Sequence, residues 1–291
     1  MLRNCVAIVS GGASGLGAAT VSHIIRHGGK ALVADLPHQH DTYLRLAAEA
    51  SAGAAKVSER IVGKNTVLRN ASASLPVIAF AEVDVRSESM ISAALDTVES
   101  VFSAPVNTCI NCAGIAIQGP VLHNTSVDKD SKSDVLADFM EHLQVNAVGT
   151  FNMARMSAER MIKRKPDAEG LRGCIINTAS IAAFEGQTGQ VGFAASKGAV
   201  VGMTLPLAND LAQYGIRVMG IAPGIFKTPM LDHISLEEQE SLAKMTPCPS
   251  RLGYPDEYAK LVISILDNHM LNGEIIRIDG ALRMSKFSDS V

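Results

Sequence analysis

Cys5-Val-Ala-Ile-Val-Ser10 is a short apolar run that passes directly into Gly11-Gly-Ala-Ser-Gly15-Leu-Gly17. The run predicts a buried strand, and the glycine-rich turn opens an amphipathic helix that we expect to reach about His27. A second apolar run, Ala31-Leu-Val-Ala34, follows and is stopped by Asp35. Strand, glycine turn, helix, strand and acid, in this order, predict a βαβ unit that holds a dinucleotide.

The residues of this unit suit the two ends of an adenosine diphosphate. Gly11 and Gly15 let the backbone approach a pyrophosphate, whose charge the helix N-terminus stabilises. Asp35 can bind both hydroxyls of the adenosine ribose and would repel a 2′-phosphate. No Lys or Arg lies in the turn or beside Asp35, which favours NAD over NADP. An ordinary tight turn is the alternative, but it does not require the second strand and the acid.

The rest of the chain continues the alternation of strands and helices without a break in composition. We expect seven strands, over about 5–10, 31–34, 76–80, 108–111, 174–177, 216–221 and 273–280. We expect helices over about 15–27, 41–50, 87–102, 133–165, 189–213 and 256–268. This pattern predicts one α/β domain, a doubly wound Rossmann domain over residues 1–291 with a seven-stranded parallel sheet.

Two stretches do not fit the alternation. Residues 51–75 are rich in Ala and Ser without firm periodicity, which indicates an inserted helical or partly ordered surface segment. Residues 229–255 carry several Pro and Met and are expected to form a lid over a substrate.

Composition excludes some classes of function. With 291 residues, 47% of them hydrophobic, and a formal charge of -3, the chain gives no electrostatic signal for nucleic acid. No apolar run is expected to span a membrane, and because the first predicted strand begins within a few residues of Met1, no cleavable leader is expected before it. Five scattered cysteines, of which Cys109 and Cys112 have CxxC spacing, are expected to be small buried hydrophobes and not metal ligands.

A candidate reaction centre lies further along the chain. An apolar run ends in Thr178-Ala-Ser180, and the next helix carries Gln190-Val-Gly-Phe193-Ala-Ala-Ser196-Lys197. Phe193 and Lys197 are four residues apart and share one helix face. A Ser that orients a substrate oxygen, opposite a Lys that lowers the pKa of a nearby acid, is typical of hydride transfer. The acid itself is missing, because Phe193 has no proton to give.

Other candidates follow predicted strands. Asp84 and Val85 can bind an adenine edge, and Asp84 can also cap the next helix. Small residues at Asn111-Cys-Ala-Gly114 let a ribose lie against the backbone. Asn146 is flanked by apolar residues in a predicted helix and is expected to point inward. The turn Ala222-Pro-Gly224 lies at the end of a strand, where ligands bind in open α/β sheets.

These motifs resemble those of the short-chain dehydrogenase/reductase family over nearly the whole chain. The matching motifs are Ser10–Gly17, Asn111–Gly114, Asn146, Ser180 and Pro223–Gly224. The chain is most similar to a branch that acts on 3-hydroxyacyl-CoA esters and on hydroxysteroids. The stretches that carry this closer similarity are Ile176–Ser180, Ala183–Gly186, Gly202–Pro206, Gly215–Met219, Pro249–Gly253 and Leu271–Glu274. The insertion at 51–75 departs from the branch in length.

The resemblance implies NAD as the cofactor and assigns a role to each matching residue. For the cofactor these are Gly11, Ser14, Gly15 and Leu16 at the pyrophosphate, Asp35 at the adenosine ribose, Asp84 and Val85 at the adenine, Cys112 near the following ribose, Lys197 at the nicotinamide ribose, and Phe226 and Thr228 at the nicotinamide. For the reaction they are Ser180 at the substrate oxygen, Gln190 in the substrate pocket, Lys197, and Asn146 holding a water in a proton relay. The family's general acid is a Tyr at the position of Phe193.

Three explanations of Phe193 stay open. In the first, Phe193 replaces the Tyr of an active parent enzyme. In the second, the chain is a natural homologue that kept the cofactor site and lost turnover. In the third, another group supplies the proton, such as water held by Lys197 and Asn146. The implied function is NAD-dependent oxidation of 3-hydroxyacyl-CoA; the alternative is an NAD-binding scaffold that acts through protein partners. The resemblance also implies a homotetramer and a mitochondrial location, with a cytoplasmic location as the alternative.

Overall fold

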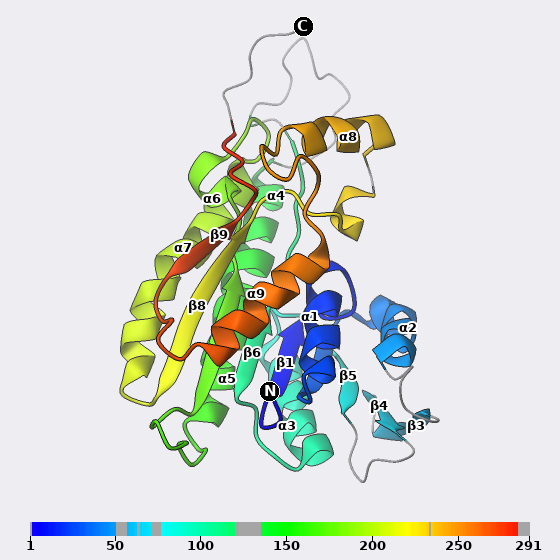
Figure 1. The fold of residues 1–291 in the computed structure, drawn as a ribbon, viewed down its shortest axis with the longest axis vertical. Coiled ribbons are helices and arrows are strands. Elements are labelled where there is room, and N and C mark those ends of the chain that lie inside the picture. Colours follow the sequence, from blue (N-terminus) through cyan, green and yellow to red (C-terminus); the bar gives the residue numbers. More distant parts are fainter. Residues whose placement is uncertain are drawn as a thin grey trace, which may run out of the picture.

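The apolar runs of the sequence pair as the parallel strands of a central sheet (Figure 1). The computed structural model describes residues 2–50, 57–62, 65–70, 77–119, 121, 135–232 and 234–284. Seven parallel strands lie in the order β5-β2-β1-β6-β7-β8-β9. They are β1 (Val6–Ser10), β2 (Lys30–Asp35), β5 (Ile78–Glu82), β6 (Thr108–Asn111), β7 (Gly173–Thr178), β8 (Ile216–Pro223) and β9 (Ile275–Ile278). The predicted seven-stranded parallel sheet is confirmed.

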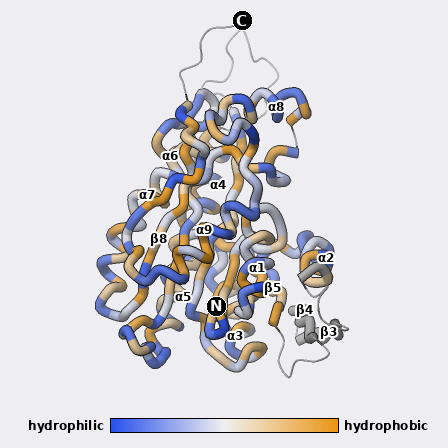
Figure 2. The backbone as a smooth tube through the Cα atoms, viewed as in Figure 1, coloured by the Kyte–Doolittle hydropathy of each residue, from blue (hydrophilic) through white to orange (hydrophobic). Residues whose placement is uncertain are grey.

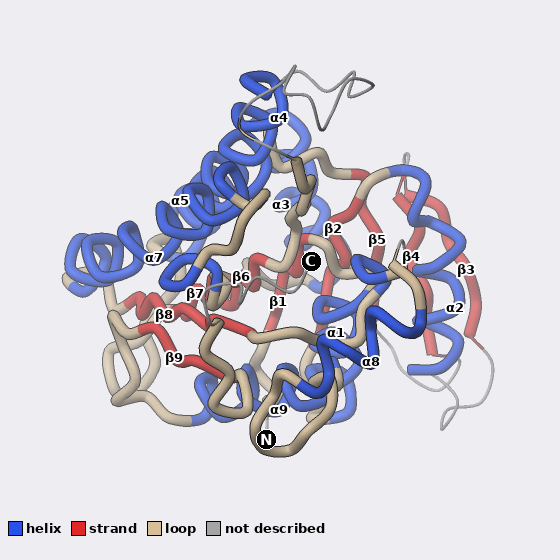
Figure 3. Tube along the Cα trace, turned by 90° about the horizontal axis from the view of Figure 1, so that it is seen from above, coloured by secondary structure: helices blue, strands red, loops and turns tan. Residues whose placement is uncertain are grey.

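Helices cover both faces of this sheet. They are α1 (Gly15–Arg26), α2 (His40–Ala50), α3 (Glu88–Phe102), α4 (Val135–His142), α5 (Gly149–Met161), α6 (Ala182–Glu185), α7 (Val191–Ala212), α8 (Leu236–Lys244) and α9 (Pro255–Asp267). One hydrophobic cluster joins the sheet to α3 and α5, and a second joins it to α1, α2 and α9. Figure 3 shows α4, α5 and α7 on one side and α1, α8 and α9 on the other. In Figure 2 hydrophobic and hydrophilic residues alternate along the flanking helices, as amphipathic packing requires.

The insertion is not helical where the structure describes it. Strands β3 (Val57–Val62) and β4 (Asn65–Asn70) form an antiparallel pair, and β4 also pairs antiparallel with β5. The insertion therefore widens the sheet to nine strands at the edge beyond β5. Val, Ile and Leu among the scattered charges suit edge strands, and the Ala/Ser content around them concealed this pattern.

The helix predicted over 133–165 is interrupted and ends earlier. A π-helical turn, Leu143–Val148, separates α4 from α5, and α5 ends at Met161. A π turn inserts one extra residue into the helical repeat, so the hydrophobic period does not reveal it. This turn carries Asn146, which is fully buried, so the prediction that Asn146 points inward is confirmed.

Helix α7 is the element that bears on the expectation that no apolar run spans a membrane. By length and composition alone this helix is apolar enough to cross a membrane, and only 28% of its most apolar window is buried. It packs along β8 and α6 and buries Ser196, Lys197 and Thr204. Core helices of folded domains pass the same test of length and composition.

Buried polar side chains link the strand ends where the functional residues lie. Ser10 Oγ at the end of β1 donates to Asn111 Oδ1 at the end of β6, over 3.4 Å. Asn111 Nδ2 in turn donates to Asn177 Oδ1 of β7, over 2.8 Å. These two hydrogen bonds hold the carboxyl-terminal ends of β1, β6 and β7 in fixed register. The strand order reverses between β1 and β6, and open α/β sheets bind ligands at such a point.

Gly149 and Val85 offer a test of how closely α5 packs on the loop after β5. A Cβ at position 149 would collide with Val85 Cγ2. We expect Gly149→Ala alone to lower the free energy of unfolding by about 1–3 kcal/mol through overpacking. The double variant with Val85→Ala should be destabilised by less than the sum of the two single changes. Urea unfolding of all four proteins measures the coupling, and additive effects would contradict the contact.

Candidate active site

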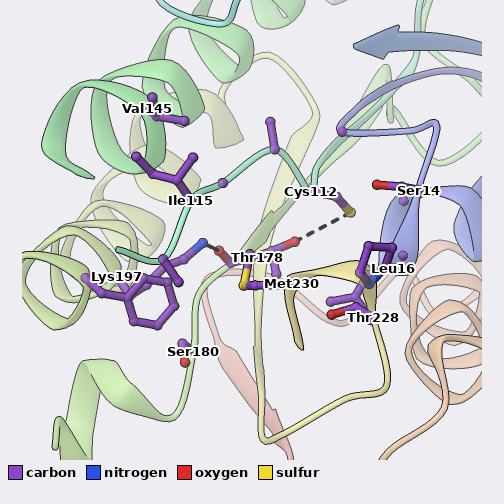
Figure 4. A pocket seen from close by; sticks show the side chains of 18 of the residues that line it. Ser14, Leu16, Cys112, Ile115, Val145, Thr178, Ser180, Lys197, Thr228 and Met230 are labelled. Atoms are coloured by element: carbon purple, nitrogen blue, oxygen red, sulfur yellow. Dashed lines mark hydrogen bonds between the residues drawn. The ribbon is translucent and has the colours of Figure 1, made fainter. Parts of the chain in front are cut away.

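A cavity of about 800 Å³ lies at the carboxyl ends of the parallel strands. Its wall contains all but one of the catalytic, cofactor-binding and substrate-binding residues that were predicted from the sequence. These are Gly11, Ser14, Gly15, Leu16, Asp35, Asp84, Val85, Cys112, Ser180, Gln190, Phe193, Lys197, Phe226 and Thr228. Figure 4 shows Lys197 and Ser180 on one side of this pocket and Ser14, Leu16 and Thr228 on the other. The remaining residue, Asn146, is buried behind the wall.

The glycine turn is packed too closely for side chains. Gly11 has a φ of 64°, and a Cβ there would lie 2.7 Å from the backbone nitrogen of Ala113. A Cβ on Gly17 would collide with the carbonyl oxygen of Gly11, and one on Gly15 would meet Thr228 at 3.3 Å. Ser14 makes no capping bond with its side chain. The first N–H groups of α1 therefore remain available to an anion, as a pyrophosphate requires.

Asp35 ends β2 at the edge of this turn. Its Oδ2 accepts from the Ala13 N–H and its Oδ1 from the Leu36 N–H, both over 2.9 Å. Burial raises the pKa of Asp35, and the two backbone hydrogen bonds oppose that rise. A carboxylate has about four lone-pair positions, so both oxygens can still accept from ribose hydroxyls. The turn and this acid together fit a nicotinamide dinucleotide without a 2′-phosphate.

The part of the cavity around Asp84 contains residues that the sequence did not indicate. Arg86 binds both carboxylate oxygens of Asp84, with Nη2 at 2.6 Å from Oδ2, and its Nη1 lies 2.9 Å from Oε1 of Glu141. The hydrogen bonds from Arg86 lower the pKa of Asp84. Arg86 follows the nominated pair directly in sequence, but Glu141 is brought to it only by the fold. Asp84 does not cap α3, because Ser87 occupies that position and accepts from the Met90 N–H.

Lys197 lies at the opposite end of the cavity. Its Nζ is buried and donates to the carbonyl oxygen of Thr178 over 2.8 Å. Burial lowers the pKa of Lys197 to about 8. The Phe193 ring lies one helical turn away, with its centroid 5.8 Å from Nζ. Ser180 Oγ accepts from the Ala182 N–H over 3.1 Å, so its own hydrogen can be donated to a ligand.

Asn146 supports Lys197 from behind. Its Oδ1 accepts from the Ile115 N–H over 2.8 Å, and its Nδ2 donates to the Ile115 carbonyl and to Ser196 Oγ. Gly114 packs closely against both Asn146 and Lys197, because a Cβ there would lie 3.1 Å from Asn146 Oδ1 and 3.4 Å from Lys197 Nζ. The small residue predicted at this strand exit therefore makes room for both side chains.

Cys112 and Thr178 join the cavity to α9. Thr178 Oγ1 lies 3.6 Å from Cys112 Sγ and 2.8 Å from the hydroxyl oxygen of Tyr258. Burial raises the pKa of Cys112, so the thiol stays protonated. All five cysteines are free. Cys5, Cys109 and Cys174 are buried, as the sequence predicted, whereas Cys112 is only partly buried and Cys248 is exposed, contrary to that prediction. Within the described residues no group of three or more His, Cys, Asp and Glu side chains could hold a metal ion.

The wall near Ser180 is mainly apolar. It includes Ile115, Ile117, Ile181, Phe193, Met230 and Met284. His142, which the sequence reasoning missed, holds part of this wall: its Nε2 accepts from the Ile117 N–H over 2.9 Å, and its ring lies edge-on to Phe193. An isolated His in an apolar helix gives no signal of such a role. Gln190 lines the wall, and its Oε1 accepts from the Gln187 N–H.

Fold and cavity are those of a short-chain dehydrogenase. The model of the short chain dehydrogenase family matches residues 44–239, and the chain belongs to this family. It is 44% identical over 283 residues to the 3-hydroxyacyl-CoA dehydrogenase type-2 of Bos taurus, covering 97% of each chain. The enzyme of the same name from Drosophila melanogaster is 44% identical over 285 residues, covering 98% of this chain and 99% of the relative.

A solved structure supports the same assignment. The crystal structure of 3-hydroxyacyl-CoA dehydrogenase type-2 from Mycobacterium avium superposes with a TM-score of 0.80 at 32% identity. The superposition covers 97% of this chain and 96% of that structure. The resemblance inferred from the sequence motifs is therefore confirmed at the level of the family and of its 3-hydroxyacyl-CoA dehydrogenase relatives.

The burial of Lys197 predicts a pH dependence of stability. Its pKa lies at about 8 in the folded chain, below the 10.5 of a solvent-exposed Lys. Between these values the unfolded chain retains a proton that the folded chain has released. Unfolding then takes up a proton, so the free energy of unfolding rises with pH across this window.

Urea unfolding of the unchanged chain and of Lys197→Met measures this effect at pH values below, within and above the window. The unfolding free energy of the unchanged chain, minus that of Lys197→Met, should rise with pH across the window. The rise should be about 1.4 kcal/mol per pH unit and up to ~3 kcal/mol in total. A difference that does not change with pH would contradict the burial of this amine.

Proposed function

We propose that this chain is an NAD-dependent oxidoreductase that interconverts 3-hydroxyacyl-CoA and 3-ketoacyl-CoA, and hydroxysteroids as a second substrate class. The observation that carries the proposal is a single cavity with a dinucleotide turn and Asp35 at one end and Ser180 and Lys197 at the other. The names of the relatives support the acyl-CoA substrate. The relatives' dehydrogenase names agree with the reaction type.

The chain's own residues bind and orient the reactants. A bound nicotinamide supplies the acceptor or donor of a hydride. Asp35 selects a ribose without a 2′-phosphate, and Thr228 can donate a hydrogen bond to a carboxamide beside Gly15. Lys197 holds the second ribose, and Ser180 donates its hydrogen to the substrate oxygen. Met230 and Leu231, at the start of the proposed lid over 229–255, face the cavity and exclude water from it.

Phe193 removes the group that would exchange a proton with the substrate oxygen. Losing a positioned acid or base typically slows a reaction by about 10²–10⁴-fold. The buried amine of Lys197 remains close to the same point and can pass a proton to a water molecule. We infer slow turnover by this route, with binding of the dinucleotide intact.

A scaffold that binds NAD and acts through protein partners is the second candidate function. Phe193 favours it, because the aromatic ring keeps the shape of the site while the acid is lost. The retention of Ser180, Lys197 and Asn146 around Phe193 favours the enzyme. The two functions differ in one respect: a scaffold gains nothing from the return of an acid at position 193.

We also propose that the chain assembles as a homotetramer in the mitochondrion. The support for assembly is the exposed apolar side of α7, where Leu205 and Val191 have exposed fractions of 56% and 52%. Exposed apolar residues also lie on α4 and α5, among them Leu136 and Phe151. Large exposed apolar side chains of this kind are typical of an interface between subunits. The mitochondrial location rests on the resemblance.

Phe193→Tyr is the direct test of the proposed enzyme. We expect NADH oxidation with acetoacetyl-CoA to increase by about 10²–10⁴-fold, because the phenol restores a positioned acid. NADH affinity, measured by fluorescence, should stay within about twofold, and NADPH should bind more weakly to both proteins. Phe184→Tyr on α6, which adds a phenol outside the cavity, is the matched control. A Phe193→Tyr protein that binds NADH without turnover would favour the scaffold.

Leu205→Glu tests the proposed assembly. A charge at the centre of the uncovered side of α7 should be excluded from an apolar interface, so sedimentation should show mainly dissociated subunits. Leu236→Glu on α8, at a position that is 77% exposed, is the matched control and should remain tetrameric. An unchanged chain that sediments as a monomer would contradict the assembly.

A further inference from the structure

The described end of the chain returns to the cavity. We call residues Asp279–Met284 the C-terminal strap. Its last residue, Met284, lines the cavity, and the Met284 N–H donates to Oε2 of Glu185 over 3.0 Å. Glu185 ends the short helix α6, which begins two residues after Ser180. This hydrogen bond therefore places Met284 at the substrate end of the cavity and not at the dinucleotide end.

Glu185 is the centre of a network of charged groups that holds the strap. Arg277 of β9 binds it, with Nη1 at 2.9 Å from Oε1, and Arg283 Nε lies 3.6 Å from the same oxygen. Arg277 also binds Asp279 Oδ2 through Nε over 2.8 Å. Burial acts to raise the pKa of Glu185, but the hydrogen bonds from Arg277 and Met284 and the Arg charges lower it overall. The carboxylate is thus charged and fully engaged at neutral pH.

The strap has little freedom to take another path. Leu282 is buried, and its carbonyl oxygen accepts from Arg277 Nη2 over 3.0 Å. Gly280 has a φ of 59°, and a Cβ there would meet Thr246 Cγ2 at 2.5 Å. Gly224, in the turn after β8, leaves room for Asp279, whose Cβ would lie 2.9 Å from a Cβ at position 224. The backbone of the strap is therefore fixed on both sides before it reaches Met284.

We propose that Met284 is a specificity-determining residue for the acyl group and that Glu185 is the residue that positions it. The inference rests on the proposed function for the choice of ligand and for the slow turnover that its test uses. Met284 is one of the apolar residues that line the substrate end, together with Ile117, Ile181 and Met230 among others. A flexible unbranched side chain adapts to short groups but occupies volume that a longer acyl chain needs.

The slow turnover inferred from Phe193 makes a binding test possible. The affinity for a 3-ketoacyl-CoA ester can be measured with NADH bound, before the two react. The NADH-loaded chain is titrated with 3-ketoacyl-CoA esters of increasing acyl length. Met284→Ala should improve the affinity for long esters relative to acetoacetyl-CoA by about 5–10-fold, within the range that one pocket contact can contribute. NADH affinity should not change. Met270→Ala, at a position that is 91% exposed, is the matched control and should leave the series unchanged.

Glu185→Gln tests the positioning role, because it removes the charge and keeps the shape. We expect the same loss of length discrimination as in Met284→Ala, with NADH affinity unchanged. Amide hydrogen exchange should become faster in 182–185 and in 279–284 together, while the glycine turn after β1 stays protected. If Glu185 only stabilised the fold, Glu185→Gln would also weaken NADH binding, or it would speed amide hydrogen exchange throughout the domain.

A parallel series of uncharged methyl ketones separates this inference from the proposed function. If the ketones bind and Met284→Ala shifts their length preference, the inference holds even where no acyl-CoA binds, and only the proposed substrate fails. If Met284→Ala leaves both series unchanged, Met284 does not set specificity. Absence of binding by either series would overturn the inference too, since a wall of a carbonyl-binding site requires such a site.

Discussion

The hydrogen bond from the buried Lys197 amine to the Thr178 carbonyl is the interaction around which the site is built. In the described part of the chain this amine has no carboxylate partner, so its charge depends on dipoles of the surrounding backbone and amide groups. β7 supplies the carbonyl, Gly114 leaves the space, and the π turn presents the Asn146 amide to Ile115 and Ser196. The parallel sheet brings these pieces together because its carboxyl-terminal strand ends lie at one edge.

This arrangement shows how Phe193 fits at the position where the sequence resemblance implies a Tyr. The ring remains packed between His142 and Lys197, so the shape of the cavity is kept. The dinucleotide end depends on other residues, namely the glycine turn and Asp35, which do not contact Phe193. The proposed binding of the cofactor and the proposed proton transfer therefore depend on different residues, and Phe193 bears only on the second.

Much of the fold and most of the cavity could be predicted from the sequence, because both depend on local signals. Apolar runs bounded by glycines mark buried strands, and Asp35 and Ser180 each follow such a run directly. The residues that escaped prediction reach the site through tertiary contacts: Glu141 of α4 meets Arg86 in the loop before α3, and Met284 meets Glu185 from the far end of the described chain. The π turn and the β3–β4 pair escaped for another reason, since neither follows the periodicity of an amphipathic helix or of an alternating strand.

The rate of NADH oxidation by the unchanged chain in a single turnover, with protein in excess over acetoacetyl-CoA, tests the central claim most directly. NADH fluorescence in the same mixture reports whether the dinucleotide is bound. The account predicts saturable binding of NADH together with hydride transfer that is slow, on the order of 10²–10⁴-fold below a dehydrogenase with its acid in place. Fast hydride transfer would show that another group replaces the acid fully, and absence of NADH binding would contradict the dinucleotide site itself.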